Sequence, residues 1–265
     1  MSTKVRYERS GAAAVLTIDR PERRNAVDAE TADLLLDSFR SFEGDDEARV
    51  LVLTGAGPEA FCAGADLKAI AEAGSRATPE DAIEAVSERP EGPMGFTRLA
   101  ASKPTIAAIS GWCLAGGLEL ALWCDLRIAT ETARLGYPER RWGVPLIDGG
   151  TQRLPRIIGQ GKALEMILTG KIVEAPEALE WSLVNEVVPP GRHIDRALEL
   201  AEGLASFPQQ TMLSDRRAAI EGSGLPLEQA LELEAKLGLA SIETGIRGAA
   251  RFAGGEGRHG KGAGA

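Results

Sequence analysis

The sequence predicts an α/β fold with a helical C-terminal region. Short apolar runs of strand length, at residues 50–53 and 105–109, each lead into a glycine-rich turn and then a helical segment. Strand signals nearly vanish after residues 184–188, where helical periodicity takes over. The chain has 265 residues, 44% of them hydrophobic, which suffices for one large domain or for a domain with a helical appendage.

The first elements are expected to be two strands and a helix. Residues 5–7 and 14–18 have strand character on either side of a Ser-Gly turn. Asp28 is expected to be the N-cap of the helix that follows, because its carboxylate can accept a backbone N–H of the first turn. The apolar run 50–53 predicts a buried strand, and a short helix is expected over 67–73.

The middle of the chain is expected to alternate between strands and helices. Residues 74–93 are rich in Gly, Pro, Ser and acids and have little periodicity, so we expect a mobile or variable excursion there. The further elements expected in this part are strands at 105–109 and 126–129 and helices at 118–123, 151–158 and 162–168.

The last third of the chain is expected to be helical. Helices are predicted over 174–183 and 194–205, and one long amphipathic helix over 227–243. The glycine-rich stretch 253–265 is expected to be loosely ordered. We therefore predict a core at 1–190 that carries the functional site and a helical oligomerisation region at 191–265.

Composition excludes several classes of function. The net charge of −9 argues against a general nucleic-acid binder. The three cysteines form no CxxC pair or zinc spacing, and with only two histidines neither a Ser-His-Asp triad nor a histidine metal site is expected. The first residues lack the apolar stretch of a signal peptide and no run approaches 18 apolar residues, so a soluble, cytoplasmic protein is expected.

Two glycine-rich turns and two glutamates carry the chemical signal. The runs AGAD at 63–66 and AGGLE at 115–119 each follow an apolar strand, and Glu139 comes twenty residues after Glu119. Glycine lets backbone N–H groups approach a ligand closely, and two such groups aimed at one oxygen stabilise an oxyanion. Two glutamates nearby can move protons on and off adjacent carbons. The combination indicates chemistry on an acyl group whose carbonyl must be polarised.

An ordered series of motifs resembles the crotonase superfamily, the enoyl-CoA hydratase/isomerase group, from about residue 5 to residue 252. The segments that carry the resemblance are IDRP at 18–21, RNA at 24–26, AFCAGADLK at 60–68, KPTIAAISG at 103–111, AGGLELALWCD at 115–125, PE at 138–139 and GGTQRL at 149–154. The resemblance implies a spiral of repeated ββα units followed by a helical C-terminal region.

The resemblance also implies the site. The oxyanion hole carries over to the backbone N–H groups of Ala65 and Gly116, and the two acid–base residues to Glu119 and Glu139. The implied activity is enoyl-CoA hydratase, a lyase of fatty acid metabolism. An enoyl-CoA or dienoyl-CoA isomerase, or a non-catalytic acyl-CoA binder, remains an alternative. The CoA arm is implied to lie near the residues Arg24, Ala63, Asp66, Leu67 and Lys68, with Lys68 as a phosphate partner.

The sequence departs from the hydratase pattern after Glu139. Trp142 and Asp148 stand where a small, glycine-rich turn is usual. Trp142 is expected to shape the acyl pocket or simply to pack. Asp148 is either a third carboxylate in the pocket, close to the extra acid that dienoyl-CoA isomerases carry one position earlier, or an N-cap of the next helix. The usual basic cluster near the C-terminus is replaced by the run GGEGR at 254–258.

The resemblance implies an acyl-CoA as the partner, with neither a metal nor a separate cofactor, since CoA belongs to the substrate. It also implies a homotrimer or a dimer of trimers, with the C-terminal helices at the interfaces and no nucleic acid or membrane as partner. A nucleotide-dependent oxidoreductase is the hypothesis from another class. It would depend on the run GAGPEA at 55–60, but Pro58 and the residues after it do not open a long helix.

Overall fold

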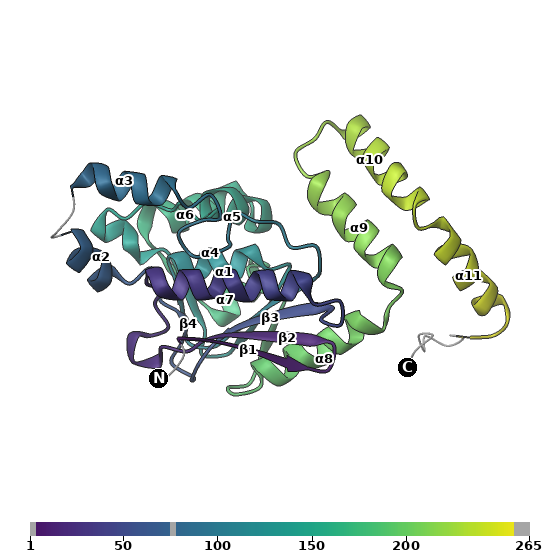
Figure 1. Cartoon of the computed structure of the whole chain (residues 1–265), viewed down its shortest axis with the longest axis horizontal. Coiled ribbons are helices and arrows are strands. Elements are labelled where there is room, and N and C mark those ends of the chain that lie inside the picture. The colour runs from purple at the N-terminus through teal and green to yellow at the C-terminus, as the bar shows by residue number, and fades with distance from the viewer. Residues whose placement is uncertain (1–3, 75–77, 257–265) are drawn as a thin grey trace. The chain divides into compact units, whose positions relative to one another are not determined.

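The structure is a computed structural model that describes residues 4–74 and 78–256. The chain divides into two compact units, Met1–Ala201 and Glu202–Ala265. The first unit contains both β-sheets and the second is helical. We describe each unit separately (Figure 1).

The larger sheet of the first unit is mostly parallel. Only its edge strand is antiparallel to its neighbour, and the register pairs Leu16 with Leu53 and Leu53 with Ala107. Those central residues are fully buried, as expected for a sheet covered on both faces. The strand order is β1 (Val5–Ser10), β2 (Ala13–Ile18), β3 (Val50–Gly55), β5 (Thr105–Ile109), β7 (Leu126–Thr130) and β10 (Glu186–Val188).

A second sheet of four short strands was not predicted from the sequence. The first three strands are parallel and the last is antiparallel to its neighbour. At three residues each, they are too short for an alternating pattern to be visible. The order is β4 (Ala60–Cys62), β6 (Trp112–Leu114), β8 (Arg134–Gly136) and β9 (Ile172–Glu174).

The two sheets arise from one repeating unit. Each of the pairs β3–β4, β5–β6 and β7–β8 contributes its first strand to the larger sheet and its second to the smaller one, and helical structure follows. The chain therefore winds as a spiral of ββα units, which confirms the predicted fold class. Because β4, β6 and β8 are adjacent and parallel, the turns after them lie along one edge of the small sheet.

Helices cover these sheets, and most lie where the sequence predicted them. The Asp28 carboxylate caps the first helix, as expected, by accepting the N–H of Thr31. The helices of this unit are η1 (Pro21–Arg23), α1 (Ala29–Gly44), α2 (Leu67–Gly74), α3 (Pro79–Ser87), α4 (Gly116–Trp123), η2 (Pro138–Trp142), α5 (Gly150–Ile158), α6 (Gln160–Thr169) and α7 (Ala175–Glu180), and α8 (His193–Ser206) crosses into the second unit.

One predicted excursion contains a helix. The expectation of an irregular segment over 74–93 is wrong for residues 79–87, which form α3. Thr78 and Asp81 form a capping box, and Pro79 occupies the first helical position. The capping signal was present in the sequence, but the abundance of acids and small residues concealed it. Residues 75–77 lie outside the described part.

After the end of α8, the second unit contains α9 (Gln209–Glu221), α10 (Leu227–Leu239) and α11 (Ile242–Ala253). The predicted single helix over 227–243 is wrong, because the chain breaks between α10 and α11. Gln210 holds the break in place, since it donates to the carbonyl of Ala240 and accepts from the hydroxyls of Ser241 and Thr244. The loosely ordered stretch predicted for 253–265 lies largely outside the described residues.

Candidate active site

The predicted oxyanion-hole residues lie at one edge of the small sheet. Ala65 follows β4, and Gly116 follows β6, the neighbouring parallel strand. A Cβ on Gly64 would lie 2.8 Å from Cβ of Ala115 and 3.0 Å from the backbone nitrogen of Gly116. Gly64 also has φ +94°. Only glycine fits this position, and its absence of a side chain lets the two turns meet.

The N–H of Ala65 points away from the segment it pairs with. Val27 uses its own N–H and C=O to bind Gly64 and Asp66, the residues on either side of Ala65. In a parallel bridge of this kind the middle residue directs its N–H to the opposite side. No acceptor for this N–H lies within residues 4–74 and 78–256. It is therefore available to a ligand.

The N–H of Gly116 is available for a different reason. Gly116 is the first residue of α4, so its N–H has no acceptor within the helix. Ala115 before it has φ 52° and ψ −128°, a conformation that costs a non-glycine residue about 1–3 kcal/mol. The helix dipole adds partial positive charge at this end. The two turns together offer donors suited to an oxyanion.

Glu119 is fixed by the loop that precedes α5. Its Oε1 accepts hydrogen bonds from the backbone N–H of Gly150 at 2.7 Å and of Asp148 at 3.0 Å. The side chain is 2% exposed, and burial raises the pKa of Glu119 to about 7 against the effect of these two donors. The negative charges of Asp148 and Glu139 raise it further. A carboxyl group that titrates near neutrality suits proton transfer.

Glu139 is buried without a protein partner. It lies in η2, directly after β8, and neither of its carboxylate oxygens has a hydrogen-bond partner among the described residues. Burial raises the pKa of Glu139 to about 7. Because the charge of Glu139 raises the pKa of Glu119 and both charges raise the pKa of Tyr137, the two carboxyl groups belong to one electrostatic environment. The structure thus brings the predicted acid–base pair together.

Asp148 is not the N-cap of α5, as one of the two expectations had it. Gly149 is the cap, and the Asp148 carboxylate instead accepts the N–H of Met94 at 3.0 Å and the hydroxyl of Thr97. The backbone of Asp148 is also tied down, because Arg153 donates to its carbonyl at 2.9 Å. Burial raises the pKa of Asp148, and these donors oppose the shift. Its contact with an acyl chain stays a prediction.

The residues predicted to contact CoA lie around the start of α2. Asp66 is buried, accepts from Arg20 at 3.0 Å, and caps α2 through the N–H groups of Lys68 and Ala69. Its carboxylate is therefore occupied by the protein, and its backbone N–H and C=O bind Val27 and Ile70. The side chains of Arg24, Leu67 and Lys68 are exposed and Ala63 is half-buried. Their CoA contacts remain predictions.

The exposed fractions of Trp142 and of the three cysteines show which of them are packed inside this chain. Trp142 is 76% exposed, so packing inside this chain is not its role, and its place in the acyl pocket remains a prediction. The three cysteines are buried free thiols, and burial raises the pKa of Cys62 to about 12. The run 55–60 leads from β3 into β4 and not into a helix, which removes the basis of the dinucleotide hypothesis.

Sequence reasoning missed Tyr137, the last residue before η2. The side chain is 0% exposed, and its hydroxyl has no hydrogen-bond partner in the described part of the chain. A Cβ on Gly150 would lie 2.5 Å from this hydroxyl oxygen and 3.0 Å from Oε1 of Glu119. The only sequence signal was its position two residues before Glu139.

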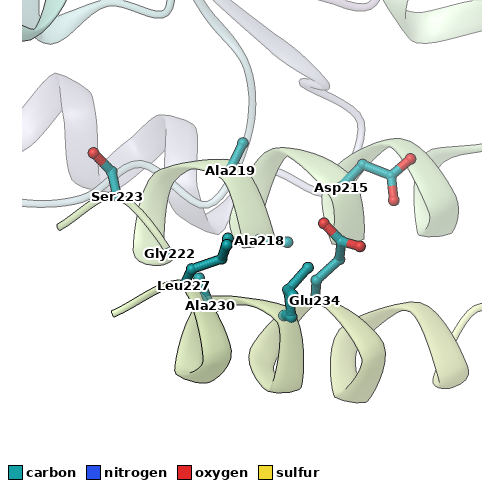
Figure 2. Close-up of a pocket in the computed structure, with 9 residues that line it drawn as sticks. Asp215, Ala218, Ala219, Gly222, Ser223, Leu227, Ala230 and Glu234 are labelled. Carbon is teal, nitrogen blue, oxygen red and sulfur yellow. The ribbon is translucent and has the colours of Figure 1, made fainter. Parts of the chain in front are cut away.

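Helices α9 and α10 form an open groove of about 520 Å³ within the second unit. Figure 2 shows the carboxylates of Asp215 and Glu234 at one end of this groove and Leu227 toward the other. Two carboxylates without a lysine or arginine in the lining do not suit the phosphates of CoA. This groove is therefore not the candidate active site.

Neither a metal cluster nor a membrane span is found in the described residues. No three His, Cys, Asp or Glu side chains there gather in a way that could hold an ion, and no helix is both long and apolar enough to cross a bilayer. The expected absence of a metal or separate cofactor stays a prediction.

Comparison with known proteins finds hydratases of CoA thioesters among the similar chains. The chain is 37% identical over 227 residues to (E)-benzylidenesuccinyl-CoA hydratase of Thauera aromatica, covering 86% of each chain. It is 36% identical over 233 residues to the short-chain-enoyl-CoA hydratase of Clostridium acetobutylicum, covering 86% of this chain and 85% of that protein.

The fold agrees with solved structures over nearly the whole length. An enoyl-CoA hydratase from Bacillus anthracis superposes with a TM-score of 0.86 at 33% identity, covering 99% of this chain and 100% of the other. A carnitinyl-CoA dehydratase from Mycobacterium avium superposes with a TM-score of 0.75 at 36% identity, covering 89% and 92%. Residues 8–253 match the family model for enoyl-CoA hydratase/isomerase, and the chain belongs to that family within the crotonase superfamily.

Proposed function

We propose that this protein is an enoyl-CoA hydratase, which adds water reversibly across the 2,3 double bond of an enoyl-CoA thioester. One observation carries the proposal. Glu119 and Glu139 are both buried, both have a pKa raised to about 7, and the charge of each raises the pKa of the same tyrosine, Tyr137. An acid–base pair of this kind suits the addition of a proton and a hydroxyl to adjacent carbons.

The proposed reaction divides the work among four groups. The N–H groups of Ala65 and Gly116 donate to the thioester oxygen and stabilise enolate character at Cα. Glu119, already oriented by two backbone donors, accepts a proton from the water that attacks Cβ. Glu139 delivers the proton to Cα. In the reverse direction each glutamate takes the opposite role.

The same proposal has the CoA arm lie along residues 63–68. Arg24 and Lys68 are exposed cations whose side chains make no hydrogen bond or ion pair with residues 4–74 or 78–256, so they are suited to phosphate groups. The buried ion pair between Arg20 and Asp66 holds this segment in place. Lys68→Ala should therefore raise KM more than it lowers kcat.

Double-bond isomerisation is the second candidate, and one observation weighs against its dienoyl form. The Asp148 carboxylate, the third acid that such a reaction would use, already accepts from Met94 and Thr97. A carnitinyl-CoA dehydratase among the similar structures carries out the related loss of water. Hydration therefore remains the function that the site supports best.

The test is hydration of crotonyl-CoA, followed by loss of the absorbance of the conjugated thioester, and then of enoyl-CoA thioesters up to C16. Glu119→Gln and Glu139→Gln should each lower kcat about 100- to 10,000-fold. Glu131→Gln, which changes an exposed glutamate, is the matched control. Parent-like rates in both active-site variants, or tight CoA binding without turnover at any chain length, would contradict the proposal.

A further inference from the structure

Tyr137 is a buried polar residue that the proposed reaction does not yet use. It lies between β8 and the Pro138 that begins η2, which fixes its backbone beside Glu139. The side chain is fully buried and its hydroxyl has no protein partner among the described residues. Buried hydroxyls without a partner are rare in proteins and point to an ordered water or a ligand.

The hydroxyl faces the acid–base pair. The position that a Cβ on Gly150 would occupy lies 2.5 Å from the tyrosine oxygen and 3.0 Å from Oε1 of Glu119. The absence of a side chain at Gly150 thus leaves the phenol and the carboxylate as near neighbours. Glu139 acts electrostatically on the same phenol. The hydroxyl is therefore a neighbour of Glu119 and lies within the electrostatic reach of Glu139.

The charges around Tyr137 fix its protonation state. Burial raises the pKa of Tyr137 well above its ordinary value, and the negative charges of Glu119 and Glu139 raise it further. The phenol therefore stays protonated at any pH at which the enzyme works. It is a hydrogen-bond donor and not a base.

The hydrogen-bond donors and acceptors that remain without a partner near Tyr137 form a specific set. Oε1 of Glu119 is already filled by two N–H donors. Both oxygens of Glu139 and the hydroxyl of Tyr137 remain without partners in the part of the chain that is described. Acceptors on two carboxylates and one neutral donor match a single water molecule, which offers two protons and two lone pairs.

We propose that the Tyr137 hydroxyl donates a hydrogen bond to the oxygen at Cβ, which is the attacking water in hydration and the 3-hydroxyl group in the reverse reaction. This inference rests on the proposed function and specifies which acyl-CoA ligands the site prefers. The site prefers acyl-CoA thioesters that carry an oxygen on Cβ. With its protons held by the glutamates and one lone pair by Tyr137, the water keeps its second lone pair for Cβ.

The chain supplies a matched control in Tyr7, its only other tyrosine. Its hydroxyl is also buried without a partner in the described residues, but it lies in β1. The charges that act on Tyr7 are those of Asp45 and Arg9 and not those of the active-site glutamates. Tyr7→Phe therefore removes the same chemical group from a different place.

The experiment measures binding of two ligands that differ by one oxygen. The dissociation constants of butyryl-CoA and 3-hydroxybutyryl-CoA are measured by calorimetry in a Glu139→Gln background, in which dehydration of the hydroxy ligand is slowed about 100- to 10,000-fold. Adding Tyr137→Phe should weaken 3-hydroxybutyryl-CoA about tenfold, the effect of one lost hydrogen bond, and leave butyryl-CoA within about twofold. Adding Tyr7→Phe should change neither constant.

Each alternative result is decisive. Equal weakening of both ligands, or of neither, would overturn the role of the hydroxyl. A large fall in Tm of Tyr137→Phe would overturn its premise, because phenylalanine fills the same space and removes only an unpartnered O–H. A parent enzyme that discriminates by the hydroxyl but does not hydrate crotonyl-CoA would refute the proposed function and leave the Tyr137 contact standing.

Discussion

Asp148 and Met94 are joined by a hydrogen bond of 3.0 Å from the Met94 N–H to Oδ1 of Asp148. The sulfur of Met94 in turn lies 2.8 Å from the position that a Cβ on Gly116 would take. Since the N–H groups of Asp148 and Gly150 hold Glu119, one loop orients the acid–base residue and braces the segment beside the oxyanion hole.

Two substitutions of Asp148 should distinguish a structural role of its carboxylate from a direct role in proton transfer. Asp148→Ala leaves the buried donors of Met94 and Thr97 without an acceptor, so the free energy of unfolding should fall by about 3 kcal/mol and kcat should fall with it. Asp148→Asn keeps an acceptor oxygen and should retain most of both. Urea unfolding and the crotonyl-CoA assay measure the two effects. A folded Asp148→Asn variant without turnover would instead indicate a direct role in proton transfer.

The rate should depend on pH through the glutamate pair. The proposed hydration needs Glu119 ionised and Glu139 protonated, and burial raises the pKa of each to about 7. The singly protonated pair is therefore most abundant near neutral pH, and kcat/KM should fall on both sides of about pH 7. The residual activity of Glu139→Gln should still fall at acid pH, but it should no longer fall at alkaline pH. A flat profile from about pH 5.5 to 8.5 would contradict this assignment.

Stability should depend on pH through Glu139. Its pKa is raised from 4.5 to about 7 in the folded state, so the folded protein binds the extra proton between these values. The associated stability is fully present below pH 4.5 and is lost as the pH rises through about 7. Glu139→Gln should lack this loss. Urea unfolding of the parent and of Glu139→Gln at about pH 5 and 8 measures this loss. The same change in the free energy of unfolding between the two pH values in both proteins would count against the raised pKa.

Ala115 should tolerate glycine and reject larger residues. Its φ of 52° and ψ of −128° cost alanine about 1–3 kcal/mol, whereas glycine adds about 0.5–1 kcal/mol of unfolded-state entropy. Ala115→Gly should therefore be at least as stable as the parent, and Ala115→Val should lose both stability and turnover. Thermal unfolding with the hydration assay checks both. A clearly destabilised glycine variant would show that the backbone there is not strained.

Much of the fold was predictable because the long elements carry their own signals. The strand Thr105–Ile109 is apolar after its first residue, and Asp28 is a residue type that favours the N-cap of a helix such as α1. The three-residue strands of the small sheet have no such signal, since their pairing comes from the winding of the chain. The break between α10 and α11 was missed because Gln210, thirty residues earlier, fixes it.

The candidate site was predictable where a residue type carries the chemistry, as with Glu119 and Glu139. The glycine turns were also visible, because close backbone approach requires glycine. The partners of Asp148 were not, since Met94 and Thr97 lie more than fifty residues away in the chain. Tyr137 was missed because a tyrosine is ordinarily a packing residue, and only its unpartnered hydroxyl marks it.

The short segment 148–150 has a consequence for redesign of the acyl specificity. An insertion there would release Glu119 from both backbone donors and separate Asp148 from Met94 at the same time. Trp142 is exposed and lies on the same connection, and it takes no part in the hydrogen bonds that hold Glu119 and Met94. Substitutions at Trp142 therefore test its predicted place in the acyl pocket with the length of the connection unchanged.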